Sequence, residues 1–384
     1  MDGNPNWVSS LFEALSAHLN VCIFQPMDPF YALCQGRLRF EALRLVEEKP
    51  RLWRRLLLLP PGWASKTFSL SRIFIEGAMR RMVQEWGSPP VILVLTYPFY
   101  VPLVGRIPEQ FLVYYCFDHY QSYEGWNKRR IETCEMRMMK RADLIICNSI
   151  AGVEAFRARF PEASSRLFYL PNATSAKFLA PYPLREPMAL PPDMADLPRP
   201  ILGCVGSITS RRLDLQLLIS LARAYPQASL ILIGDVEDRP GSQGYEAVQK
   251  LSTLPNVHLI GRRPHRLLPA YIQSFDVCLI PLADNLFNRT SCPLRMFDYL
   301  ASTRPVVSTP LADGFLFVDE DVIYFAGDPE AFIEKVCSIL RAGGDGLEER
   351  RWLIAKQHTW EERAKALWVV LAERLNSRMA YTGR

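Results

Sequence analysis

The sequence predicts an α/β fold with two doubly wound domains, each built around a parallel sheet. Short continuous apolar runs alternate with helical patterns along the chain, which is typical of β-α units whose strands are buried on both faces. A proline-rich stretch at 181–200 interrupts this alternation, which restarts at residue 201. The length of 384 residues also suits two domains better than one.

Residues 1–180 are predicted to form the first Rossmann-like domain. Its expected strands are the apolar runs at 20–24, 55–59, 91–95, 111–115, 144–147 and 166–170, with helical patterns at 73–85 and 131–141. Glu132 and Glu135 lie in the second helical pattern among basic residues, so we expect a solvent-exposed charged face there.

Residues 201–355 are predicted to form the second Rossmann-like domain, after a linker at 181–200. Its expected strands lie at 201–206, 229–234, 257–261, 277–280 and 305–308, and its helices at 213–224, 267–274 and 294–302. An amphipathic stretch from Trp360 to Leu375 predicts a terminal helix within residues 356–384. Such folds bind ligands beyond the carboxyl ends of their strands, so we expect an active site in a cleft between the domains.

Composition excludes several classes of protein. With 49% hydrophobic and 22% charged residues the chain is neither disordered nor fibrous, and no apolar run reaches the ~18 residues of a membrane-spanning helix. The start lacks a basic segment followed by an apolar one, so no secretory signal is expected. Nine cysteines without a C-x-x-C pair indicate reduced cytoplasmic thiols rather than a zinc site or disulfides.

The net charge of +5 comes from the first half of the chain. A basic half suits an anionic acceptor or a membrane surface, and a solvated face explains it equally well. No dense Lys/Arg block or RNA-type aromatic motif is present, so nucleic acid is not an expected partner.

A candidate anion site lies in the second half. Ser291 or Cys292 is predicted to cap a helix whose first turn holds Pro293, and such a helix start suits a phosphate or diphosphate. Arg295 adds positive charge one turn in, and Asp298 lies on roughly the same face, where its carboxylate can hold ribose hydroxyls. An ordinary helix with a surface Arg/Asp pair explains the same residues.

The segment 293–301 with 304–307 resembles the P-x-K-x-x-E-Y-L-A-x-G-x-P-V-V signature of GT-B glycosyltransferases that use sugar nucleotides. Further similarity covers residues 170–173, 203–207, 230–234, 257–261 and 359–363. The resemblance implies a GT-B fold with two Rossmann-like domains facing across a cleft. It also implies a donor-binding second domain, an acceptor-binding first domain and a terminal helix that crosses back to the first. A UDP- or GDP-linked sugar would be the donor, with no metal or other cofactor.

Carried over by position, the resemblance makes Asp298 a ribose ligand and puts Thr290 where the family has its first acid. Ser207 replaces a diphosphate-binding Arg, and Arg295 replaces a Lys. The resemblance also implies that Arg262 lies on the loop that lines the nucleobase pocket in this fold. The predicted donor-binding residues are Ser207, Arg211, Arg212, Arg262, Thr290, Ser291, Arg295 and Asp298.

Asp118 and His119 follow a buried strand and are the predicted catalytic residues, because both side chains can move protons. The stretch 114–120 resembles the Y-D-x-x-D-D/H-Y segment of bacterial exopolysaccharide and teichuronic acid glycosyltransferases. Asp118 would act as general base in an inverting enzyme and would position the donor in a retaining one. Residues 53–55 and 80–81 suit either a membrane contact or domain packing.

The sequence therefore predicts a metal-independent glycosyltransferase. It would move a sugar from a nucleotide-diphosphate sugar to a hydroxyl of a glycan or lipid-linked acceptor in bacterial surface polysaccharide biosynthesis, in the cytoplasm at the inner face of the membrane. The alternative is a catalytically degenerate GT-B scaffold that binds a nucleotide or a partner enzyme, which the uncharged Ser207 and Thr290 favour.

Overall fold

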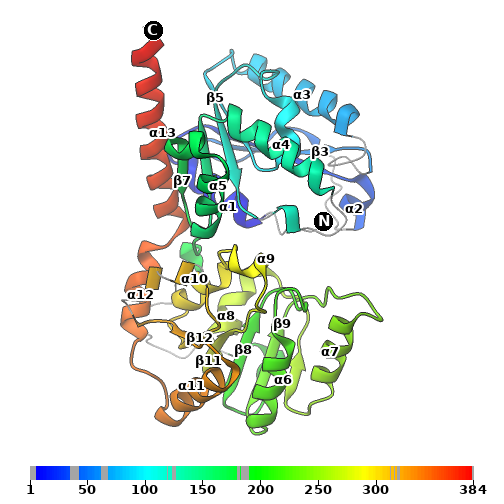
Figure 1. The fold of residues 1–384 in the computed structure, drawn as a ribbon, viewed down its shortest axis with the longest axis vertical. Helices are drawn as coiled ribbons and strands as arrows, with labels where there is room; N and C mark the ends of the chain where they lie inside the picture. Colours follow the sequence, from blue (N-terminus) through cyan, green and yellow to red (C-terminus); the bar gives the residue numbers. More distant parts are fainter. Residues whose placement is uncertain are drawn as a thin grey trace. The chain divides into compact units, whose positions relative to one another are not determined.

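The computed structural model describes residues 6–34, 43–61, 68–118, 120–122, 127–179, 182, 190–311, 313–314, 316–317 and 321–382. These residues form two compact units, each built of strands and helices (Figure 1). Unit 1 takes its residues from 1–148, 152–170 and 361–384, and unit 2 from 149–151 and 171–360. The division falls before the linker predicted at 181–200, and the described residues 190–200 belong to unit 2.

Unit 1 contains two sheets. A three-stranded sheet has the order β1-β3-β2, and a four-stranded sheet has the order β4-β5-β6-β7. All neighbours are parallel except β2 and β3, which are antiparallel. The exposed strand β2, Val-Glu-Glu-Lys, lacks the apolar run by which the other strands are predicted. The strands are β1 (Val21–Met27), β2 (Val46–Lys49), β3 (Leu52–Leu58), β4 (Val91–Leu95), β5 (Glu109–Cys116), β6 (Leu144–Cys147) and β7 (Leu167–Tyr169).

Helices cover the sheets of unit 1. They are α1 (Asn6–Leu15), α2 (Pro29–Cys34), α3 (Phe68–Glu85), α4 (Lys128–Arg141), α5 (Ile150–Arg159), α13 (Trp360–Thr382) and the 3-10 helices η2 (Pro98–Leu103), η3 (Tyr120–Ser122) and η4 (Pro161–Arg166). The predicted exposed face of α4 is wrong at Glu135, which is only 4% exposed. Its carboxylate accepts hydrogen bonds from Arg159 at 2.8 Å and Gln121 at 3.1 Å. Burial raises the Glu135 pKa.

The terminal helix α13 packs on unit 1. The rings of His18 and Trp368 stack with centroids 5.8 Å apart. Arg374 donates to the carbonyl of Ser165 at 2.6 Å. Contacts of this kind hold the terminal helix against residues from 1–148 and 152–170 within unit 1.

Unit 2 is built on one parallel six-stranded sheet with the order β10-β9-β8-β11-β12-β13. Successive residues of β9 enter opposite cores: Leu230 and Leu232 pack into one cluster, Ile231 and Ile233 into the other. The sheet is therefore buried on both faces, as the continuous apolar runs predict. The strands are β8 (Ile201–Val205), β9 (Ser229–Ile233), β10 (Val257–Leu259), β11 (Val277–Ile280), β12 (Val306–Ser308) and β13 (Tyr324–Phe325).

The helices of unit 2 begin at side-chain caps in several places: Asp214, Ser242 and Asp328 each accept a backbone N–H at the start of α6, α7 and α11. The helices are α6 (Leu215–Ala224), α7 (Gln243–Ser252), α8 (Leu268–Gln273), α9 (Leu286–Arg289), α10 (Leu294–Ala301), α11 (Pro329–Ala342) and α12 (Glu348–Gln357), with the 3-10 helices η5 (Ala176–Phe178), η6 (Pro192–Met194) and η7 (His265–Leu267). Within the described part of the chain, no helix combines the length and apolar character needed to cross a membrane.

Candidate functional site

The candidate donor site lies at the carboxyl edge of the six-stranded sheet, where β8 and β9 end close together. Gly206 donates its N–H to Ile233 O at 2.9 Å, and Ile208 donates to Asp235 O at 2.9 Å. A Cβ atom on Gly234, at φ +158°, would lie 2.0 Å from Gly206 O. Only glycine fits where the two chain segments cross.

Arg295, in the first turn of α10, lies over the end of β8. A Cβ atom on Gly206, at φ +126°, would lie 2.7 Å from Arg295 Nη2. Arg295 Nη1 also donates to Cys204 Sγ at 3.4 Å. The predicted cation therefore lies directly against the glycine turn after β8, where its charge could attract a phosphate.

Asp298 lies one turn further along α10 and is bonded to a segment that the sequence analysis did not assign to the site. Thr174 donates its hydroxyl to Asp298 Oδ1 at 2.8 Å. Asn172 donates to the carbonyl of Cys292, just before α10, at 2.6 Å. These bonds explain why residues 171–179 belong to unit 2 and not to the first domain as predicted.

The protein surrounding Asp298 changes its acidity. Burial of the carboxyl group raises the Asp298 pKa from its ordinary value to about 7, against the opposing effect of the Thr174 hydroxyl. Asp298 therefore changes its protonation state near neutral pH. Its ability to accept hydrogen bonds from ribose hydroxyls would change with pH in that range.

Two acidic residues lie beside predicted donor-binding residues and were missed by the sequence analysis. Ser207 donates its hydroxyl to Glu237 Oε1 at 2.6 Å. Arg262 lies 3.7 Å from Asp235 Oδ2, and more than half of each side chain is exposed. Both acids follow β9, so their place in the parallel sheet, next to β8 and β10, brings them to this edge.

Arg211 and Arg212 gather on one aromatic ring. Their guanidinium carbons lie 4.6 and 4.4 Å from the centroid of Phe287, on α9. Asn288 Nδ2 donates to both of their carbonyl groups at 3.1 Å. The loop that carries the two arginines is therefore fixed against α9.

The predicted cap of α10 is wrong. The helix begins at Leu294 with Pro293 as its N-cap and with no side-chain cap hydrogen bond. The Ser291 hydroxyl instead donates to Asn288 O at 3.1 Å, and the Thr290 hydroxyl donates to Leu286 O at 2.8 Å. Both hydroxyls close the end of α9, so toward a ligand they present oxygen acceptors.

Asp118, the predicted catalytic residue of unit 1, follows β5 at the carboxyl edge of the four-stranded sheet. Burial raises the pKa of the Tyr97 hydroxyl to about 12, and the negative charge of Asp118 adds to this effect. The ring of Tyr97 lies 5.6 Å from that of Phe117 and 5.3 Å from that of Tyr120. Asp118 is therefore partly buried beside a cluster of aromatic rings. His119 lies outside the described residues.

Groups of metal-binding side chains were sought throughout the described ranges. No three His, Cys, Asp or Glu residues there lie close enough together to hold a metal ion.

The chain was compared with known proteins by family model and by sequence. Residues 199–342 match the family model described as Glycosyl transferases group 1. The Bacillus subtilis (strain 168) protein TuaH, whose name assigns it to teichuronic acid biosynthesis as a glycosyltransferase, is 26% identical over 241 residues. The alignment covers 61% of this chain and 58% of TuaH, less than two thirds of that relative's length.

Solved structures resemble the whole chain. Sucrose-phosphate synthase from Thermosynechococcus elongatus has a TM-score of 0.71 at 21% identity, covering 98% of this chain and 94% of its own. HepE from Anabaena in complex with UDP and glucose has a TM-score of 0.64 at 15% identity, with 97% and 96% covered. The predicted GT-B fold is thereby confirmed.

Proposed function

We propose that this chain, whose residues 199–342 form a group 1 glycosyl transferase domain, moves a sugar from a nucleoside-diphosphate sugar to an acceptor hydroxyl. One observation carries the proposal: the matched domain contains all eight predicted donor-binding residues, and Arg295 and Asp298 lie within it on one short helix at the carboxyl edge of the sheet. A structural neighbour, HepE, binds UDP in its crystal structure, which favours a uridine nucleotide as the first donor to test.

Arg295 would bind the diphosphate beside the glycine turn after β8, and Asp298 would accept hydrogen bonds from the ribose. Positive charge fixed at the leaving group stabilises the nucleoside diphosphate as the bond to the sugar breaks. This electrostatic stabilisation requires no metal ion or organic cofactor, and we propose a metal-independent reaction. Arg211 and Arg212, held on Phe287, are the further candidate cations.

Asp118 is the proposed acid–base group for the acceptor. In an inverting reaction its carboxylate takes the proton of the attacking hydroxyl, and in a retaining reaction it orients the donor sugar. The neighbouring rings of Tyr97 and Phe117 offer apolar faces against which a sugar can stack.

The acceptor is proposed to be a glycan or lipid-linked intermediate of a bacterial surface polysaccharide, made at the cytoplasmic face of the membrane. The support is the resemblance to TuaH and the excess of basic residues in the first half of the chain.

A thermal-shift experiment tests the donor site. We expect UDP or GDP to raise the melting temperature of the wild type, because a ligand in large excess over its Kd stabilises the folded protein by several kcal/mol. Arg295→Ala and Asp298→Ala should lose this shift, whereas Arg223→Ala and Asp196→Ala, at exposed positions of the same unit, should keep it. A folded wild type that no nucleotide stabilises would contradict the proposal.

The degenerate-scaffold alternative predicts binding without turnover. Asp118→Asn separates the two readings, because a general base contributes about 10²–10⁴-fold to the rate. We expect this variant to keep nucleotide binding and to lose transfer of the sugar to an acceptor. Wild-type protein that binds the nucleotide sugar but transfers nothing to any glycan or lipid-linked acceptor would favour the scaffold.

A further inference from the structure

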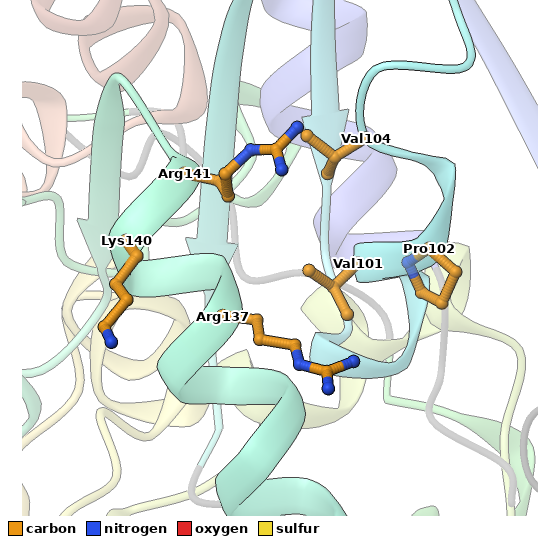
Figure 2. A pocket seen from close by; sticks show the side chains of 6 residues that line it. All are labelled: Val101, Pro102, Val104, Arg137, Lys140 and Arg141. Atoms are coloured by element: carbon orange, nitrogen blue, oxygen red, sulfur yellow. The ribbon is translucent and has the colours of Figure 1, made fainter.

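Two groups of charged side chains differ in what they can recognise. A cavity of about 430 Å³ in unit 1 lies between η2 and the last turns of α4, and all the charged residues that line it are basic (Figure 2). These residues, Arg137, Lys140 and Arg141, can attract an anion of any kind but offer no acceptor for N–H groups. The carboxyl edge of the sheet in unit 2 instead holds an acceptor and a donor side by side, Asp235 and Arg262.

Asp235 lies on the same face of the sheet as α10. The core on that face contains Ile233 of β9 and Met296 of α10. Beyond the ends of β8 and β9 the pairing resumes as a bridge between Ile208 and Val236, and Ile208 belongs to the opposite core. Because paired residues share a face and successive side chains alternate, Val236 faces that opposite core and Asp235 faces the α10 side.

Asp235 and Arg262 also lie next to the candidate diphosphate site. The register of β8 and β9 places Asp235 beside Ser207. Ser207 directly follows Gly206, the glycine against which the Arg295 guanidinium lies. Arg262 follows β10, the next strand, and lies 3.7 Å from Asp235 Oδ2. Neighbouring strands are about 4.8 Å apart, so a nucleotide whose diphosphate is bound at the glycine turn can reach this pair with its base.

The two side chains attract each other without forming a hydrogen bond. At 3.7 Å their paired atoms are beyond hydrogen-bond distance, and 56% of each side chain is exposed. The ion pair of Arg289 with Asp284 in the same unit is different, because two hydrogen bonds of 2.6 Å join its side chains. Asp235 and Arg262 therefore keep acceptor and donor atoms that a ligand can use.

Guanine is the base that complements such a pair best. Its N1–H and N2–H groups are adjacent donors, and the O6 atom beside them is an acceptor. A carboxylate can accept both N–H groups, and a guanidinium can donate to O6. Uracil, adenine and cytosine each place an acceptor next to the donor on the corresponding edge, so one carboxylate oxygen would face a lone pair instead of an N–H group.

We infer that the donor is a guanosine-diphosphate sugar, whose base binds Asp235 through N1–H and N2–H and Arg262 through O6. This inference rests on the proposed sugar transfer and identifies the nucleotide that the site selects. Uridine nucleotides share the ribose and the diphosphate, so they should bind the same site more weakly and still report on Arg295 and Asp298.

Calorimetric titration of the full chain with GDP, UDP and inosine diphosphate tests the inference. A bidentate contact to the correct base discriminates against a wrong base by about 5- to 150-fold. We therefore expect GDP to bind the wild type more tightly than UDP by a factor in this range. Inosine diphosphate lacks only the N2 amino group of GDP, and its affinity should lie between the other two.

Asp235→Asn removes the charge of the carboxylate and keeps the shape of the side chain. The variant should bind GDP about 5- to 150-fold more weakly and lose most of the preference for GDP over UDP and over inosine diphosphate. Asp196→Asn removes the same charge from an exposed position of the same unit and should keep the wild-type preference. Thermal unfolding of each variant verifies that it is folded.

Two outcomes overturn the inference and leave the proposed transfer intact. The wild type could bind UDP at least as tightly as GDP, with both nucleotides losing their affinity in Arg295→Ala. A preference for GDP that Asp235→Asn leaves unchanged would show that the base is recognised elsewhere. A folded wild type that binds neither nucleotide would instead contradict the proposed function, and the inference with it.

Discussion

Burial raises the Asp298 pKa, and the Thr174 hydroxyl opposes this effect by lowering it. Thr174→Val removes its 2.8 Å hydrogen bond to Asp298 Oδ1 and keeps the shape of the side chain. A hydrogen bond to a charged group contributes about 1.5–3 kcal/mol, which corresponds to about 1–2 pKa units. Because the Asp298 pKa is about 7, the variant should shift it to about 8–9.

The shift should appear as weaker nucleotide binding at neutral pH. If ribose hydroxyls bind the carboxylate form, the ionised fraction at pH 7 falls from about one half to about one tenth or less, and the affinity for UDP falls about 5- to 50-fold. Calorimetric titration between pH 6 and 9 measures this. The affinity of the wild type for UDP should rise with pH, with a midpoint at about pH 7. The affinity of Thr174→Val should rise with a midpoint about 1–2 pH units higher, and the two affinities should become equal at high pH.

Thr174→Ser is the matched control, because it retains the hydroxyl and should keep the wild-type pH profile. The reasoning would be refuted if the Thr174→Val profile had the wild-type midpoint. It would also be refuted by an affinity reduced equally at every pH, since that would assign Thr174 a packing role alone.

Three further variants test particular contacts. Gly206→Ala places a Cβ atom 2.7 Å from Arg295 Nη2 at a backbone φ of +126°. We therefore expect at least tenfold weaker UDP binding and a free energy of unfolding lower by about 1–3 kcal/mol. The control Gly241→Ala, at φ +83° with open space around it, should leave UDP binding unchanged in the same titration. Arg351→Leu removes the buried ion-pair partner of Asp345. We expect the free energy of unfolding, measured in urea, to fall by about 3–5 kcal/mol. A fall of less than about 1 kcal/mol would argue against the ion pair. Asp298→Asn should raise the free energy of unfolding at pH 8 and not at pH 4. Because the Asp298 pKa is raised in the folded protein, the wild type loses stability progressively as the pH rises from about 4 to about 7. An equal effect of the substitution at both pH values would contradict the raised pKa of Asp298.

The chemistry of the candidate donor site could be read from the sequence only in part. The sequence predicted that Arg295 and Asp298 lie on one helix, and the apolar runs predicted the strands β8 and β9, which precede this helix in the chain. The sequence did not reveal Thr174 or Asn172 as neighbours of α10, because they lie more than a hundred residues from it along the chain. The hydrogen bond between Ser207 and Glu237 also could not be predicted, because it depends on the pairing of β8 with β9.

Charge patterns were the least reliable guide. Glu135 shares the pattern of Glu132 and was expected to be solvated, yet it is buried against Arg159 and Gln121. The strand β2 was missed because its four exposed residues follow neither an apolar run nor a turn signal. In both cases the environment comes from elements that the local sequence does not contain.

The sequence by itself determined the α/β class and the strands of the buried sheet. A strand covered on both faces needs apolar residues at every position, so the strand can be recognised from its own few residues. The tertiary structure decided where the chain divides into units, which carboxylates are buried, and how the Asp298 pKa is raised. These properties depend on which distant segments pack together, because desolvation and hydrogen bonding act through space and not along the chain.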